Sequence, residues 1–101
     1  MNYKHKLLIR EIPIDRTIFI EDEIHPIIIT LKKDGEKHHA KILSANCPHQ
    51  GGPLSRGEIE GSYVSCPWHG CKFDIETGKG LSKLSLTELE SLVDGEYLYV
   101  F

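Results

Sequence analysis

The 101-residue sequence predicts an all-β fold, and three observations carry that prediction. Isoleucine occurs twelve times but alanine only twice, a bias toward β-branched side chains that pack well on pleated sheets. No window over residues 4–43 shows a long apolar period of 3.6 residues, the pattern of an amphipathic helix. Asp-Gly pairs at 34–35 and 94–95 each separate two strand-like runs, and Asp-Gly readily supplies the positive φ angles of a tight hairpin turn.

The first part of the chain, residues 4–43, predicts a β meander. Residues 17–20 and 26–31 are the first two strand-like runs. The Asp-Gly turn at 34–35 should then lead into a returning strand over residues 37–43.

The end of the chain predicts a second hairpin, with strands over residues 88–93 and 96–101. Alternate residues of a strand share one face, so Tyr97, Tyr99 and Phe101 should point the same way. A short helix over residues 84–92 is the alternative, because three leucines in that segment fall three residues apart. We favour the strand.

Residues 46–80 differ in composition from the strand-like segments before and after them. Seven of the nine glycines and three of the five prolines lie in this segment, which therefore predicts loops rather than regular strands. Long loops inside a small domain are uncommon unless a function or an inorganic centre holds them in place.

The charge pattern narrows the possible partners. The formal net charge is −3, and no cluster of Lys and Arg suggests a phosphate-binding face, which argues against nucleic acid. The acids form short groups: Glu21, Asp22 and Glu23, and then Glu88, Glu90, Asp94 and Glu96. Each group taken alone is typical of a solvated surface. An acidic surface would also suit a protein partner with a basic docking face.

No targeting segment is expected. Three apolar residues precede Arg10 near the N-terminus, too few for the core of a signal peptide. The longest uninterrupted apolar run, residues 27–29, falls far short of the roughly 20 residues that span a bilayer. We therefore expect a cytoplasmic protein without a membrane anchor. Three cysteines in such a protein indicate metal binding or redox chemistry rather than a disulfide framework.

Two short motifs decide between those possibilities: Cys47-Pro48-His49, and Cys66-Pro67-Trp68-His69 after 16 intervening residues. Each motif offers one thiolate and one imidazole. Zinc could take the set, but mixed zinc motifs usually group Cys with Cys and His with His. One ligand of each kind in each loop suits a two-iron centre, in which one iron receives both thiolates and the other both imidazoles.

Together with the glycines and prolines around them, these motifs resemble the signature of Rieske [2Fe-2S] proteins, and the chain length resembles that of a free-standing Rieske ferredoxin. The resemblance implies one [2Fe-2S] cluster, with Cys47 and Cys66 on the inner iron and His49 and His69 on the outer, solvent-facing iron. It also implies a single domain over residues 1–101. A sandwich-like antiparallel β base would carry a small loop-built cluster-binding subdomain at about residues 46–80.

The function that the resemblance implies is a soluble one-electron carrier. It would pass electrons from a reductase to an oxygenase or another terminal oxidoreductase, and would not itself be an enzyme, because 101 residues leave no room for the mononuclear iron domain of Rieske oxygenases. The alternative is a small accessory subunit of a larger oxidoreductase, of the nitrite-reductase or arsenite-oxidase type. A structural zinc domain is a third hypothesis, which the alternating ligand order disfavours.

The remaining candidate residues have simpler interpretations. Cys71 is surplus to the ligand set, and we interpret it as a small packing residue. Trp68 should shield the cluster. Four histidines without a partnered spacing are interpreted as surface residues: His5, His25, His38 and His39.

The resemblance also implies a low reduction potential. High-potential Rieske proteins have a disulfide between cysteines at the positions of Gly52 and Trp68, and neither residue is a cysteine here. They also place a serine and a tyrosine, both hydrogen-bond donors to the cluster, where this chain has Cys71 and Phe73. Because the reduced cluster then has fewer donors, we expect a potential toward the lower end of the roughly −150 to +300 mV Rieske range.

Overall fold

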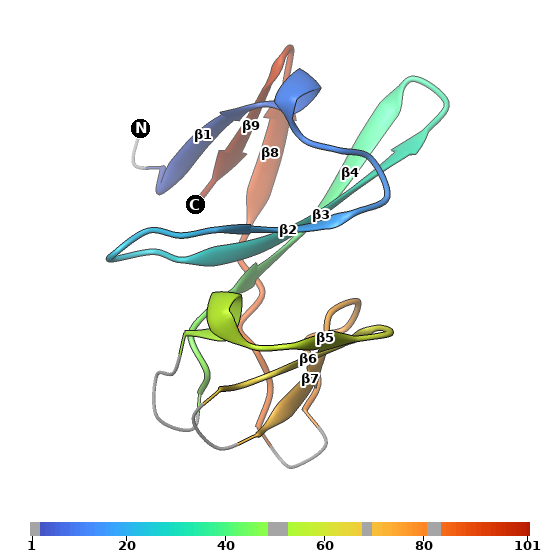
Figure 1. The fold of residues 1–101 in the computed structure, drawn as a ribbon. Coiled ribbons are helices and arrows are strands. Elements are labelled where there is room, and N and C mark those ends of the chain that lie inside the picture. Colours follow the sequence, from blue (N-terminus) through green and yellow to red (C-terminus); the bar gives the residue numbers. More distant parts are fainter. Residues whose placement is uncertain (1–2, 49–52, 68–69, 81–83) are drawn as a thin grey trace.

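The computed structural model describes residues 3–48, 53–67, 70–80 and 84–101, and it confirms an all-β fold of antiparallel sheets (Figure 1). The described residues form three sheets of three strands each. The strands are β1 (His5–Leu8), β2 (Thr17–Ile20), β3 (Ile27–Asp34), β4 (Lys37–Ser44), β5 (Ile59–Glu60), β6 (Tyr63–Ser65), β7 (Lys72–Asp74), β8 (Ser91–Asp94) and β9 (Tyr97–Val100). Two single-turn 3₁₀ helices, η1 (Ile9–Glu11) and η2 (Leu54–Arg56), interrupt them. Within the described ranges, no helix is long and apolar enough to cross a membrane.

The central sheet has the order β2-β3-β4 and confirms the predicted hairpin. Strand β3 extends three residues past the predicted end, so that Asp34 pairs with Lys37 directly across the turn. Gly35 at that turn has φ +62°, the left-handed conformation that glycine adopts without strain.

Strand β3 separates two hydrophobic cores. Ile27, Ile28 and Ile29 are all buried, so the strand lacks the usual alternation of buried and exposed residues. Ile28 packs into the core that contains the cysteines, whereas Ile27 and Ile29 pack into a second core with Leu98 and residues of the terminal strands. The apolar run in the sequence therefore reflects a strand covered on both faces.

The terminal sheet has the order β1-β9-β8, and here the predicted meander is wrong at its start. Strand β1 does not pair with β2 but with the last strand, in a register that joins His5 to Val100 and Leu8 to Tyr97. As Figure 1 shows, the two ends of the chain lie together in this sheet. The C-terminal hairpin is confirmed, and along β9 buried Leu98 and Val100 alternate with half-buried Tyr97 and Tyr99.

The prediction that His5 is a surface residue is wrong. Its side chain is buried, and its ring nitrogen Nε2 donates a hydrogen bond to the backbone carbonyl of His25 at 2.7 Å. Burial is tolerated because that hydrogen bond satisfies the ring. His25 and His39 are exposed and His38 is half-buried.

Residues 84–90 form neither the predicted strand nor the alternative helix. The strand β8 begins only at Ser91. Before it, Leu86 N bonds to Gly78 O (2.7 Å), Ser44 N to Thr87 O (2.8 Å) and Leu89 N to Ile42 O (2.9 Å). Leu86 packs into the first core and Leu89 against the second, so the leucine spacing serves two separate cores rather than one helix face.

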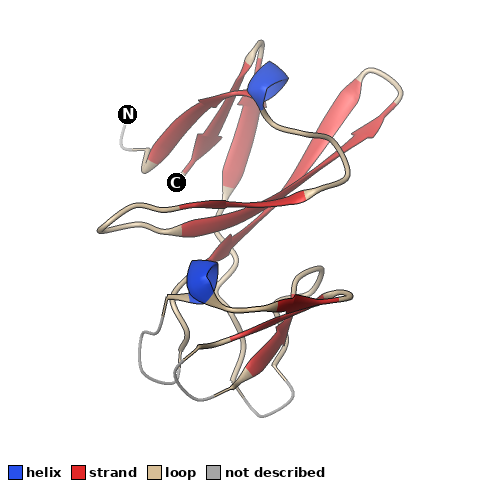
Figure 2. Ribbon diagram, viewed as in Figure 1, coloured by secondary structure: helices blue, strands red, loops and turns tan. Residues whose placement is uncertain are grey.

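The third sheet, β5-β6-β7, lies at the opposite end of the molecule from the terminal sheet, and loops make up most of the segment around it (Figure 2). Its strands are two or three residues long. Because so short a sheet buries little surface by itself, the core it shares with the central sheet must stabilise it. That core contains Val64, Phe73 and Ile75 from this end together with Ile28 and Leu43 from the central sheet.

Candidate metal centre

Cys47 lies three residues beyond the end of β4, on a segment held from two sides. Ala45 N donates to Pro26 O at 2.9 Å, which ties the segment to the loop before β3. Leu54 N donates to Ala45 O at 3.0 Å, and Asn46 forms an isolated antiparallel bridge with Pro53. The two ends of the first loop are therefore closed on each other.

Cys66 directly follows strand β6 and is joined by backbone hydrogen bonds to the residues that precede β7. Gly70 N donates to Cys66 O (2.9 Å), and Cys66 N donates to Cys71 O (2.7 Å). Gly70 has φ +68°, a conformation that favours glycine and lets the chain fold back toward β7. The second loop is thus closed at its base as well.

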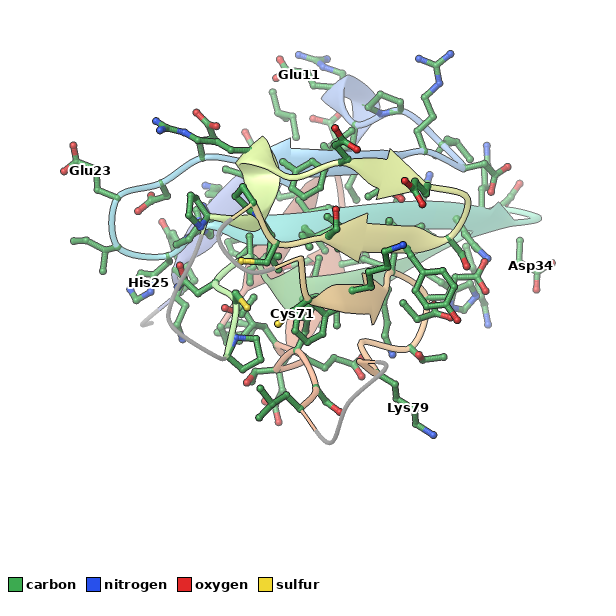
Figure 3. All side chains as sticks on the ribbon, turned by 60° about the horizontal axis from the view of Figure 1, so that its bottom comes forward. Glu11, Glu23, His25, Asp34, Cys71 and Lys79 are labelled. Carbon is green, nitrogen blue, oxygen red and sulfur yellow. The ribbon has the colours of Figure 1, made fainter. Side chains whose placement is uncertain are left out.

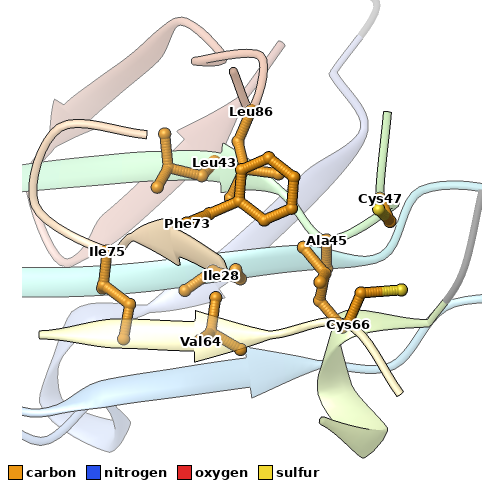
Figure 4. Close-up of a cluster of buried hydrophobic side chains, with 10 residues drawn as sticks. Ile28, Leu43, Ala45, Cys47, Val64, Cys66, Phe73, Ile75 and Leu86 are labelled. Carbon is orange, nitrogen blue, oxygen red and sulfur yellow. The ribbon is translucent and has the colours of Figure 1, made fainter. Parts of the chain in front are cut away.

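The two cysteines lie in one hydrophobic cluster although they are 19 positions apart in the sequence (Figure 4). Cys47 is 2% exposed and Cys66 is 3% exposed. Buried neighbours include Ala45, Leu54 and Phe73. None of the three cysteines of the chain forms a disulfide, so no such bond competes for Cys47 and Cys66.

This donor set fits an iron–sulfur cluster. Thiolates are the ligands that such clusters require, and here two of them come from separate closed loops into a dry environment. The other two expected ligands, His49 and His69, lie outside the described residues, as does Trp68. Their roles stay predictions. Within the described residues, no three His, Cys, Asp or Glu side chains form another group that could hold a metal.

The comparison with known families decides the identity of the centre. A sequence model of the Rieske [2Fe-2S] domain matches residues 9–92. The chain belongs to the Rieske family. It accordingly binds one [2Fe-2S] cluster, the group that the two buried cysteines fit.

The curated relatives of this Rieske domain are much longer proteins. The human protein named apoptosis-inducing factor 3 is 39% identical over 77 residues, which cover 71% of this chain but 12% of that protein. The oxygenase component of 3-ketosteroid-9-alpha-monooxygenase from Rhodococcus rhodochrous is 43% identical over 44 residues, covering 44% of this chain and 10% of that one. The chain thus spans only a small part of these relatives.

Solved structures similar to this Rieske domain include proteins of its own length. The ferredoxin of carbazole 1,9a-dioxygenase from Nocardioides aromaticivorans IC177 superposes with a TM-score of 0.64 at 19% identity, covering 99% of this chain and 97% of that one. A Sphingomonas yanoikuyae B1 ferredoxin gives a TM-score of 0.63 at 16% identity, with 98% and 97% coverage. A protein described as the small subunit of a nitrite reductase gives 0.62 at 15%, with 100% and 99% coverage. At these identities the likeness establishes the fold.

Sequence reasoning missed the residues that surround the cysteines. Ile28, Leu43 and Leu86 come from outside the 46–80 segment yet form one core with Cys47 and Cys66. Their apolar character was visible in the sequence, but a pattern read along the chain cannot show which of two cores each residue joins.

Cys71 is half-buried and packs against the core that contains the other two cysteines. We expect Cys71→Ala to keep the [2Fe-2S] cluster, because alanine retains the side chain's packing on the core apart from one sulfur atom. Iron per chain and the visible absorption spectrum, compared with the unmodified protein, would check this. Loss of iron in a variant that still folds would show that Cys71 is a ligand.

Proposed function

We propose that this Rieske protein is a one-electron carrier that takes electrons from a reductase, passes them to an oxygenase or another terminal oxidoreductase, and is not itself an enzyme. The observation that supports this most is the pair of cysteines, Cys47 and Cys66, held in one dry core on two closed loops. When bound there, the cluster supplies one-electron chemistry. The protein's part is to fix the ligands, which keeps reorganisation small as the charge changes.

The ligands proposed for the cluster are Cys47 and Cys66 on one iron and His49 and His69 on the other. Imidazoles in place of two thiolates leave less negative charge on the cluster, which raises its potential above that of an all-cysteine cluster. The histidines should form the exit for the electron, since they follow the cysteines by two and three residues on short loops.

A structural neighbour supports the choice of an oxygenase as partner. Its title describes a complex of reduced oxygenase and oxidized ferredoxin in carbazole 1,9a-dioxygenase, and it superposes on this chain with a TM-score of 0.60 at 21% identity. The direct experiment is reduction of the purified protein by one electron equivalent per chain. Titration with dithionite should reduce the protein fully, and air should reoxidise it. Turnover of an organic substrate by the protein alone would contradict the proposal.

A second candidate is a small accessory subunit of a larger oxidoreductase. The neighbour described as a nitrite reductase small subunit favours it, because that structure and this chain cover each other almost completely. Co-purification with a large subunit at fixed stoichiometry would support this candidate. Elution of the protein from cell extracts without a bound subunit would support the free carrier.

The potential should lie toward the low end of the Rieske range, and Phe73→Tyr should raise it. Phe73 is fully buried in the same core as both cysteines, so a hydroxyl added to its ring would lie inside that core. A hydrogen bond from the tyrosine hydroxyl to a thiolate would stabilise the reduced cluster by about 1 kcal/mol. For a one-electron couple, that free energy raises the reduction potential by about 40 mV. Voltammetry measures the shift, with Phe73→Leu as the control that adds no donor. An unchanged potential with an intact cluster would contradict this explanation.

A further inference from the structure

The loop between β2 and β3, residues 21–26, lies beside the first cysteine loop. Pro26 O accepts the hydrogen bond from Ala45 N, two residues before Cys47. A surface pocket of about 530 Å³ lies between the two loops. It is lined by Glu21, Asp22, Glu23 and Pro26 from one side and by Ala45, Asn46, Pro53 and Arg56 from the other. A molecule seated on this loop would therefore also reach the segment that carries Cys47.

Ile24, on the same loop, is the most exposed large apolar side chain of the described residues, at 75%. An isoleucine exposed to this degree offers an apolar side chain that a docked partner would remove from water, which favours binding. Six residues of the described part are large, apolar and exposed. Of these, Ile24 lines a second pocket that shares Pro26 and Asn46 with the first, so it adjoins the segment that leads to Cys47.

The loop around Ile24 is fixed by hydrogen bonds on both sides. Asp22 Oδ1 accepts from Ile24 N at 2.8 Å and from His25 N at 3.0 Å, while His25 O accepts from the buried ring of His5. A contact residue that is already held in place loses little conformational entropy when a partner binds.

The charges at the pocket are predominantly negative. Three carboxylates line it against one guanidinium, that of Arg56. Lys4 and His25 line the neighbouring pocket together with Ile24. Figure 3 shows Glu23 projecting from this edge of the molecule, on the opposite side from Asp34 at the β3–β4 turn.

We propose that the β2–β3 loop and its pocket form the docking surface for the redox partner, and that the partner presents an apolar depression ringed by Lys or Arg side chains. This inference rests on the proposed function as an electron carrier. Ile24 is the apolar anchor at its centre. Glu23, at the rim, steers a basic partner toward the cluster end of the molecule.

The test uses the reduced, cluster-loaded protein and the strongly basic haem protein cytochrome c as a one-electron acceptor. One electron passes from the reduced cluster to the ferric haem, and stopped-flow absorbance gives the second-order rate constant at low and high salt. Glu23→Lys and Ile24→Ser probe the surface. Two variants are the controls. Glu36→Lys changes the net charge by the same amount at the distant β3–β4 turn. Leu92→Ser removes a different exposed apolar side chain, that of Leu92 on β8, which is 49% exposed.

At low salt we expect Glu23→Lys to lower the rate about fivefold and Glu36→Lys less than twofold, a difference that high salt should remove. Ile24→Ser should lower the rate about threefold at both salt concentrations, and Leu92→Ser should not. Equal effects of the two lysine variants, or a normal rate for Ile24→Ser, would overturn the proposal.

Ferricyanide, a small acceptor that needs no docking surface, separates this inference from the proposed function. At high salt, which screens the attraction of this anion to the added lysines, every variant should reduce it at the rate of the unmodified protein. If the unmodified protein cannot pass its electron even to ferricyanide, the electron-carrier proposal fails. If only the cytochrome c results deviate from expectation, the docking surface alone is wrong.

Discussion

Replacing Cys66 with serine is expected to abolish cluster binding, and Cys47→Ser should do the same. A serine hydroxyl is not ionised at neutral pH and is a poor ligand for iron where a thiolate is required. Iron per chain should fall from about two to near zero, together with the visible absorption of the cluster.

Both cysteines are almost fully buried in a core, so loss of iron must be separated from loss of the fold. Circular dichroism and the urea midpoint of each variant provide that separation. Cys71→Ser is the matched control, because it makes the same chemical change at the half-buried third cysteine. Normal iron content in Cys47→Ser or Cys66→Ser would remove that residue from the ligand set.

Gly57→Ala is expected to destabilise the third sheet by about 3 kcal/mol or more, a large cost for a single methyl group. The backbone of Gly57 is ordinary, with φ −81° and ψ 179°, so alanine is allowed there by conformation. The obstacle is contact: a Cβ atom would overlap the backbone carbonyl of Ser65 at the end of β6. Ser65 is fixed by the hydrogen bond from its N to Glu58 O at 2.9 Å, and Cys66 is the next residue.

The urea midpoint and the iron content after refolding would both fall in Gly57→Ala. Gly61→Ala is the matched control on the same sheet: Gly61 has φ +60°, but nothing lies within 4 Å of its added Cβ. It should cost only about 1 to 2 kcal/mol of left-handed strain. If the two variants were equally stable, steric overlap at Gly57 would not be what requires glycine.

Local signals in the sequence predicted the elements that depend on local chemistry. The hairpin β3–β4 and the hairpin β8–β9 each form around Asp-Gly, and both glycines adopt the positive φ that the turn requires. Patterns over a few residues suffice for such elements because turn geometry fixes which residues pair.

Elements that depend on distant partners were not predicted. Strand β1 pairs with β9, about ninety residues away, and nothing near His5 indicates that its ring reaches the carbonyl of His25. Residues 84–90 bond singly to several segments instead of to one strand, so their leucine spacing resembled a helix face. These errors share a cause, since periodicity reports burial but not the partner that provides it.

The candidate site was predicted in its chemistry more than in its surroundings. Cys47 and Cys66 were identified from their two motifs and from the resemblance of these motifs to the Rieske signature, and the structure brings both into one core. The phenyl ring of Phe73 in that core was not placed by the sequence. It shares that core with the cysteines because β7 and the cysteine-bearing segments pack on the central sheet.

The ligation of the [2Fe-2S] cluster by two cysteines and two histidines can be tested by pulsed electron paramagnetic resonance of the dithionite-reduced protein. We expect a spin-½ signal with nitrogen hyperfine coupling from two imidazoles, in a protein that contains two irons and no zinc. A reduced cluster without nitrogen coupling, or a colourless protein with one zinc per chain, would contradict it.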